Sequence, residues 1–226
     1  MLDNNASSNT ISGFLRYLAS HEQAETEGLP ALDKLSAELQ INRSTLREQL
    51  KVARALGLVA VKPRIGTRRL PYTFTPAVRQ SLGYAIALDK NYFEVYSDLR
   101  NHIESAYFHE AVQKLSDADI QELKTLIDQA WKKLRGHPVE IPHSEHRELH
   151  MLIHKRLDNI FVTGLLEAYW EAYEAVGLNV FTDYEYLTKV WQYHTDMVNA
   201  IDNNDYDLGY KMLMEHTDLI YHRPVS

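Results

Sequence analysis

The chain has 226 residues, contains no cysteine and carries a formal net charge of -7 at pH 7. The absence of cysteine excludes disulfides and thiolate metal sites, and it is consistent with a reducing cytoplasm. No run of about 18 apolar residues predicts a membrane span, and the polar N-terminal residues are not those of a signal peptide. We therefore expect a cytoplasmic protein with no membrane partner, long enough to form two domains.

The charge is divided unevenly along the chain. Residues 1–70 hold 10 Lys and Arg against 7 Asp and Glu, a net charge of +3, whereas residues 71–226 hold 14 against 24, a net charge of -10. A basic region suits a polyanion such as DNA, which would repel the acidic remainder. We expect two domains with separate tasks, 1–71 and 77–226, joined by a linker at 72–76 that two prolines bracket.

Apolar residues at helical spacing predict three helices in the N-terminal domain. The first runs from Thr10 to about Ser20, the second carries three leucines and ends near Gln40, and Asn42 is placed to cap the third. One face of the third helix is apolar and the adjacent face is basic. Two helices joined so tightly predict a helix-turn-helix motif.

A β-hairpin with a basic tip is predicted after Gly57, where the apolar run 58–61 is followed by basic residues and Gly66. A helix-turn-helix followed by a hairpin describes a winged helix, whose recognition helix enters the major groove with its N-terminal residues at the base edges. We expect the DNA contacts to come from Arg43, Ser44, Thr45, Arg47, Lys51, Lys62, Arg64, Gly66 and Thr67. The alternatives are a winged helix used for protein contacts and a basic face that is only solvated.

Beyond residue 76 the sequence predicts helices almost throughout and no convincing strand. Apolar spacing and breaks at Gly, Pro, Asn and Asp place them at 77–88, 91–114, 117–135, 143–157, 159–177, 183–202 and 204–222. The expected fold class is mainly α, an N-terminal winged helix-turn-helix followed by an all-α helical bundle. Binding sites in such bundles commonly lie between facing helices.

Four histidines of the bundle are candidates for a metal site. His146 and His150 are four residues apart, so a helix puts both imidazoles on one face, close enough to bind one ion. His194 and His216 lie 10 and 12 residues from Asn204, on two helices that a tight turn would make antiparallel, and so at similar depth. Four imidazoles from three helices are therefore expected to converge.

Each of these histidines also has a simpler interpretation as a core residue that binds nothing. That interpretation is given to the remaining histidines of the bundle, His102, His109, His137, His143 and His222. His154 shares the helical face of His150 and is kept as an alternate ligand.

The N-terminal residues resemble the DNA-binding domain of the GntR family of bacterial transcription regulators. The resemblance is carried by Leu29-Pro30, Arg43-Ser44-Thr45-Leu46-Arg47-Glu48, Gly57-Leu58-Val59 and Gly66-Thr67. The sequence departs from the family at Asp33, where a basic residue is usual, and at Arg64, where a glycine is usual. We expect Asp33 to remove one DNA contact and Arg64 to supply another.

Residues 77–226 resemble the effector-binding FCD domain of the FadR subfamily. The resemblance implies a metal held by an Asp, a His four residues later, and two His on the last two helices. His150, His194 and His216 match these histidines, and His146 stands at the Asp position. Four neutral imidazoles favour a borderline divalent transition metal, Zn or Ni, and they leave its charge uncompensated, which favours an anionic effector.

The resemblance also implies an arginine that grips the carboxylate of the effector, and Arg100 matches its position. The alternative for Arg100 is a surface salt bridge with Glu104. We expect a transcription regulator rather than an enzyme, a homodimer that binds palindromic double-stranded operator DNA under the control of a small carboxylate. Two other readings stay open, a regulator with a metal-free apolar effector pocket and a metal-dependent hydrolase fused to a DNA-binding domain.

Overall fold

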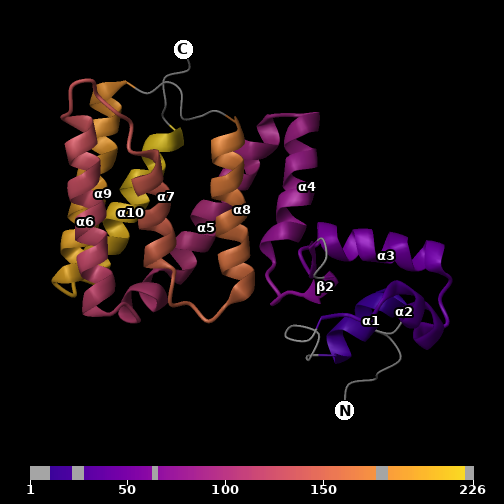
Figure 1. Ribbon diagram of the computed structural model, residues 1–226. Coiled ribbons are helices and arrows are strands. Elements are labelled where there is room, and N and C mark those ends of the chain that lie inside the picture. Colours follow the sequence, from indigo (N-terminus) through magenta and orange to yellow (C-terminus); the bar gives the residue numbers. More distant parts are fainter. Residues whose placement is uncertain (1–10, 22–27, 63–65, 177–182, 222–226) are drawn as a thin grey trace. The chain divides into compact units, whose positions relative to one another are not determined.

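The computed structural model describes residues 11–21, 28–62, 66–176 and 183–221 (Figure 1). The chain divides into two compact units, Met1–Gln80 and Ser81–Ser226, and each has its own hydrophobic core. Helix α4, Thr75–Leu88, begins inside the expected linker at 72–76. Its second residue is Pro76, which a first helical turn tolerates because the N–H that proline lacks would have no partner there.

The first unit has the element order of a winged helix. Its elements are α1 (Gly13–Ser20), α2 (Leu32–Leu39), α3 (Arg43–Ala55), β1 (Val59–Lys62) and β2 (Gly66–Arg69). The two strands pair in antiparallel fashion, with Val59 opposite Arg69 and Lys62 opposite Gly66. The predicted helix-turn-helix and hairpin are therefore confirmed.

Local residue choices set the helix ends in this unit. Asn42 caps α3 as predicted, because its Oδ1 accepts the N–H of Thr45 at 2.8 Å. Gln40 ends α2 in a left-handed conformation with φ at 53°. Gly57, with φ at 70°, turns the chain from α3 toward β1, and a Cβ there would lie 2.6 Å from the ring of Pro76.

The apolar face of α3 packs into the core of the first unit. Its buried members are Phe14, Tyr17, Leu18, Leu35, Leu46, Ala53 and Val59. Leu46 and Ala53 belong to α3, and Leu50 packs against the same core while partly buried. The basic residues of α3 consequently lie on the surface of the unit.

The second unit is a helical bundle, and from Ser81 onward the described residues form no strand. After α4 its helices are α5 (Asn91–Gln113), α6 (Asp117–Leu134), α7 (His143–Ile153), α8 (Ile160–Val176), α9 (Tyr184–Asp202) and α10 (Tyr206–Tyr221). The predicted fold class, mainly α with a winged helix and then a bundle, is confirmed. Among the described residues, no helix is long and apolar enough to cross a membrane.

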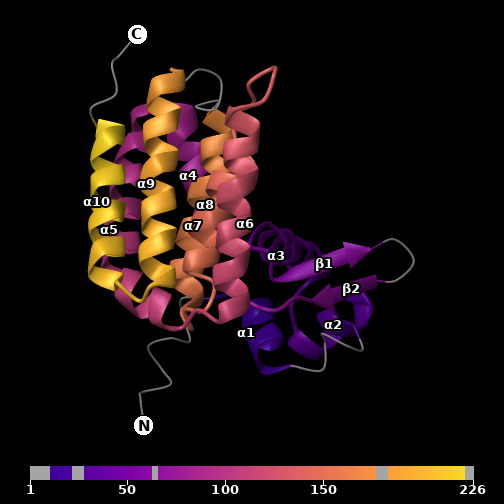
Figure 2. The ribbon, with the colours of Figure 1, turned by 90° about the vertical axis from the view of Figure 1, so that its left-hand side faces the viewer.

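Helix α7 is central to the bundle because it contacts α5, α6 and α8 (Figures 1 and 2). Helix α9 packs against both α6 and α10, and α10 packs in turn on α5. Fully buried side chains fill the space between these helices, among them Phe108, Leu123, Leu149, Leu166 and Ile201. Side chains of α5, α7, α9 and α10 can therefore meet in one interior region.

Helix α7 is shorter than the predicted helix 143–157. It ends at Ile153, and His154 is its C-cap. The chain must turn there to begin α8, which Asn159 caps by accepting the N–H groups of Phe161 and Val162 at 3.1 and 3.3 Å. The earlier end leaves His146 and His150 on the same helix.

Candidate metal centre and nucleic-acid interface

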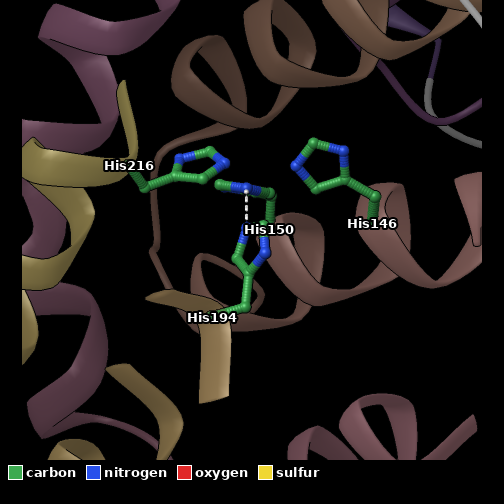
Figure 3. A group of neighbouring side chains, drawn as sticks. All are labelled: His146, His150, His194 and His216. Carbon is green, nitrogen blue, oxygen red and sulfur yellow. Dashed lines mark hydrogen bonds between the residues drawn. The ribbon is translucent and has the colours of Figure 1, made fainter. Parts of the chain in front are cut away.

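Three helices of the bundle supply the four candidate metal ligands (Figure 3). His146 and His150 lie one turn apart on α7, His194 lies on α9 and His216 on α10. Their ligand atoms all lie within 4.8 Å of one another, and each ring turns a nitrogen toward the middle of the group. The structure brings together the four histidines that were predicted from their spacing to converge. The group could hold a metal ion.

The tight turn between α9 and α10 sets the register of His194 and His216. Asn204 has a left-handed backbone with φ at 57°, and the N–H of Asp205 donates to the carbonyl oxygen of Ala200 at 2.9 Å. Asparagine adopts this conformation more readily than most residues. The helices leave the turn with the two imidazoles level, and their ring centroids lie 4.3 Å apart.

The distances within the group are close to those that one shared ion requires. His150 Nε2 and His194 Nε2 face each other at 3.1 Å. Two nitrogens bound tetrahedrally to zinc, each at about 2.0–2.1 Å, would be about 3.3–3.4 Å apart. The ring of His146 completes the group, with its centroid 4.8 Å from that of His194 and 5.7 Å from that of His216.

Burial keeps all four imidazoles neutral. It lowers the pKa of His194 to about 3, and Arg100 contributes in the same direction. It also lowers the pKa values of His146, His150 and His216 well below the usual 6.5, with further lowering from neighbouring imidazoles and Arg100. A neutral imidazole offers its lone pair to a metal, so no proton has to be displaced near pH 7.

His146 is the member of the group that reaches the surface. Its side chain is partly exposed, whereas His150, His194 and His216 are buried. Its Nε2 is nevertheless buried and has no hydrogen-bond partner within the described part of the chain.

Glu104 links the histidine group to the arginine on α5. Its Oε2 lies 3.0 Å from His150 Nδ1, and its Oε1 lies 2.9 Å from Arg100 Nε. A carboxylate beside Nδ1 favours the tautomer that carries its proton there, which leaves Nε2 as the metal-binding atom. This His-carboxylate arrangement is common around protein-bound metals.

Arg100 is buried, so its alternative interpretation as a surface salt bridge is wrong. The ion pair with Glu104 forms, but the two side chains are only 2% and 0% exposed, because α5 packs between α8 and α10. The guanidinium lies over the rings of Tyr169 and Trp170, 4.8 and 5.1 Å from their centroids. Its Nη1 donates to Asn101 Oδ1 at 2.9 Å, whereas its buried Nη2 finds no acceptor among the described residues.

Trp170 borders the histidine group, and sequence reasoning missed it. Its ring centroid lies 4.9 Å from that of His146 and 5.4 Å from that of His150. Its buried Nε1 also lacks an acceptor within the described residues. Its spacing could not have identified it, because it lies on α8 and the four histidines lie on other helices. Its residue type alone indicates a core residue.

The other histidines of the bundle lie outside the group. His154 is buried, and its Nδ1 contacts the carbonyl oxygen of His150 at 2.9 Å, so its place as an alternate ligand is not supported. The core interpretation is wrong for His102 and His137, which are exposed, because their helix face and loop meet solvent. His109 and His143 are partly buried, and His222 lies outside the described residues.

The residues expected to contact DNA are displayed by α3 and the hairpin. Those that lie exposed are Arg43, Ser44, Thr45, Arg47, Lys51, Lys62 and Gly66. Thr67 is partly buried, and its carbonyl oxygen accepts the N–H of Leu29 at 2.7 Å, which ties the chain before α2 to β2. Arg64 lies outside the described residues. The exposed members all belong to one unit, and the roles of the whole set in binding stay predictions.

Comparisons with known proteins agree with both units. Residues 95–219 match the FCD domain family. Over 210 residues the chain is 21% identical to a Bacillus subtilis (strain 168) protein named "Uncharacterized HTH-type transcriptional regulator YcbG", covering 93% of this chain and 86% of that protein. A solved structure of Streptococcus agalactiae GntR shares the fold with a TM-score of 0.63 at 18% identity, covering 85% of this chain and 87% of the other.

The matched FCD region covers more than half of the chain, and a winged helix precedes it. The family match is to transcription regulators, so it speaks for a regulator and against the hydrolase alternative. The chain therefore belongs to the GntR family of transcription regulators, in the FadR-like group with a C-terminal FCD domain.

Proposed function

We propose that this regulator binds one divalent transition metal through His146, His150, His194 and His216, and that the metal takes part in binding a small carboxylate effector. The observation that carries the proposal is the convergence of four neutral imidazoles from three helices, with all ligand atoms within 4.8 Å. A purely structural core would rarely collect four polar rings, since each buried ring nitrogen needs its own partner. A single cation would satisfy all four lone pairs at once.

The donor set favours Zn or Ni over Mg or Ca. Imidazole nitrogen suits borderline transition metals, whereas the hard cations prefer oxygen ligands. His146 replaces the acidic ligand expected from the family resemblance, so all four protein ligands are neutral. The four ligands would leave the charge of the bound ion uncompensated in a buried place, where Glu104, beside His150, offsets part of it.

The surroundings of the group favour an anion as effector. Arg100 Nη2 and Trp170 Nε1 are buried donors without acceptors in the described part of the chain. Unsatisfied buried donors cost free energy, and a carboxylate would relieve that cost for whichever donors it reaches. Together with the uncompensated charge of the metal, these donors support a small carboxylate rather than an apolar compound.

The winged helix supports binding to operator DNA, with Arg43, Ser44, Thr45, Arg47 and Lys51 on the recognition helix. Lys62, Arg64, Gly66 and Thr67 of the hairpin are assigned to the same interface. Winged-helix readers commonly bind two half-sites about one DNA turn apart, which gives a palindromic operator and requires two copies of the chain. Such a regulator works beside the chromosome, so we assign it to the cytoplasm.

An exposed apolar stripe on α5 supports a homodimer. Tyr92, Val95 and Leu99 of α5 are 50, 67 and 45% exposed. Their spacings of three and four residues place them on one face of α5, as in a helix that packs lengthwise against another helix. A two-fold axis would bring the same stripe from a second copy against it. Effector binding would then regulate DNA binding if it favoured one arrangement of the pair.

Metal analysis tests the proposal directly. The purified protein is stripped with a chelator, dialysed, supplied with Zn or Ni, and assayed for bound metal and for thermal stability with small carboxylates and acyl compounds. We expect about one ion per chain, and carboxylates that stabilise the metal-loaded form more than the stripped form.

His194→Ala should abolish stoichiometric metal binding while the metal-free variant still folds and binds DNA. His109→Ala, which changes a histidine outside the group, is the matched control and should bind metal normally. A wild-type protein that takes up neither metal would overturn the proposal, and stabilisation by apolar acyl compounds alone would favour the metal-free alternative. Loss of folding in His194→Ala would support a structural role for the histidines.

A further inference from the structure

An ion pair joins the two helices of the helix-turn-helix motif at the start of the recognition helix. Asp33, in the first turn of α2, places its Oδ1 2.8 Å from Nε of Arg43, the first residue of α3. The side chains are 57% exposed for Arg43 and 70% for Asp33, so the pair lies on the surface. An exposed pair of this kind adds little to stability. Its position suggests a role in binding instead.

The atom that Asp33 engages determines what Arg43 has left to offer. The carboxylate of Asp33 lies beside Nε, while Nη1 and Nη2 at the end of the guanidinium have no partner among the described residues. Two parallel N–H donors match the O6 and N7 acceptors that guanine displays in the major groove. A carboxylate at Nε also restrains a long side chain, so less conformational entropy is lost when the guanidinium meets a base.

The charge of Asp33 should also lower the affinity for DNA, and this effect can be distinguished from an effect on base preference. Its negative charge lies beside the helix that is expected to enter the groove, where it repels phosphates and weakens binding to DNA of every sequence. A residue that acted only through this charge would lower affinity uniformly. A residue that also orients Arg43 would change the preference for one base.

We propose that Asp33 is a positioning residue that holds Arg43 for reading one guanine in each operator half-site. This inference rests on DNA binding by the winged helix and extends it to base specificity. Asp33 then exchanges non-specific affinity for discrimination at a single position. The sequence predicts that Asp33 removes one DNA contact. This inference instead gives Asp33 an effect on the contact that Arg43 makes.

Selection of binding sites from random double-stranded DNA, followed by affinity measurements on the selected site and its single-base variants, tests this inference with the full-length protein. Arg43→Ala should abolish the preference for guanine at one position of each half-site. Asp33→Ala should weaken the preference at that same position by up to about fivefold, while affinity for unselected DNA rises. Asp33→Asn removes the charge but keeps an oxygen that can accept from Nε, and it should retain most of the preference.

Glu38→Ala is the matched control, because Glu38 is another exposed acid on α2. It should raise affinity for all sequences slightly and leave every base preference unchanged. The inference is overturned if Asp33→Ala behaves like Glu38→Ala. It is also overturned if Asp33→Ala and Arg43→Ala alter the base preference at different positions of the half-site. If the wild type selects no sequence at all, DNA reading itself fails, and the inference fails with it. Thermal unfolding of each variant checks that these surface changes leave the fold intact.

Discussion

The two units of this regulator use polar groups in opposite ways. In the winged helix the pairs Asp33–Arg43 and Glu48–Lys51 are exposed, with side-chain exposures between 57 and 73%. In the helical bundle Arg100, Glu104 and His150 are at most 2% exposed. Exposed charges contribute little to stability but are free to meet a partner, whereas buried ones cost desolvation and persist only in a connected network. Substitutions at the exposed pairs should therefore alter binding, and those in the buried network should alter folding.

The largest effect is expected at the buried network. Glu104→Ala leaves the Arg100 guanidinium buried without its carboxylate and should destabilise the bundle by about 3–5 kcal/mol. It should also weaken metal binding by about 10–100-fold, because His150 loses the group beside Nδ1. Urea unfolding followed by tryptophan fluorescence measures the first effect in the bundle alone, since all 3 tryptophans lie beyond residue 80.

The control for that prediction lies on the same helix. Glu110 pairs with Lys114 at 2.7 Å, but their side chains are 53 and 42% exposed. Glu110→Ala should cost about 0–1 kcal/mol. Equal losses from the two substitutions would break the contrast between buried and exposed charges.

The exposed stripe on α5 provides the next effect. Val95→Glu puts a carboxylate at the centre of the proposed dimer contact, twice because the contact is two-fold, and should weaken the dimer by about 2–4 kcal/mol. Analytical ultracentrifugation over a range of concentrations measures the change. Val139→Glu, at a valine that is 50% exposed in the connection between α6 and α7, should leave the dimer intact. A stable dimer in Val95→Glu would place the contact elsewhere.

A smaller effect is expected in the DNA-reading unit. Arg47→Ala removes an exposed cation from the recognition helix and should cost operator binding about 1–3 kcal/mol if the side chain reads a base. Titrations with the selected operator measure the loss, and thermal stability should barely change. Lys189→Ala, at an exposed lysine of the bundle, is the control for lost positive charge. An unchanged affinity in Arg47→Ala would argue against α3 as the recognition helix.

The smallest effect concerns Asp119, which is buried although its partners are partly exposed. Hydrogen bonds from Arg156 and Ser116 lower the pKa of this carboxyl below its usual 3.8. Its stabilising contribution is therefore full above about pH 4 and is lost as the pH falls toward the lowered pKa. Asp119→Asn should cost about 1 kcal/mol at pH 7, and the difference from wild type should shrink below pH 4. A difference that is constant with pH in urea unfolding would contradict this assignment.

Local patterns in the sequence were sufficient to predict most of the fold. Asn42 as a helix cap, the apolar spacing of Leu46 and Leu50, and Gly57 before the hairpin each act through neighbours a few residues away. The same holds for His194 and His216, because one tight turn at Asn204 relates their two helices. Pairs governed by one helix or one turn can be read from spacing alone.

Contacts between distant segments could not be predicted in this way. The helical spacing of Arg100 and Glu104 suggested a surface pair, and only the packing of α5 against its neighbours made it a buried one. Trp170 reached the histidine group on a helix whose rotation no local pattern specifies. The contact between Glu104 and His150 likewise joins residues on α5 and α7.

The sequence by itself determined the two kinds of chemistry in this protein, a basic winged helix and four histidines at ligand spacing, because helical periodicity and capping act within a few residues. Tertiary structure decided which polar groups would be buried together. Burial depends on how whole helices pack, and it is burial that makes the four imidazoles neutral, turns Arg100 inward and leaves its Nη2 without an acceptor in the described residues. The surface pair of Asp33 and Arg43 was decided in the same way, by how α2 packs against α3.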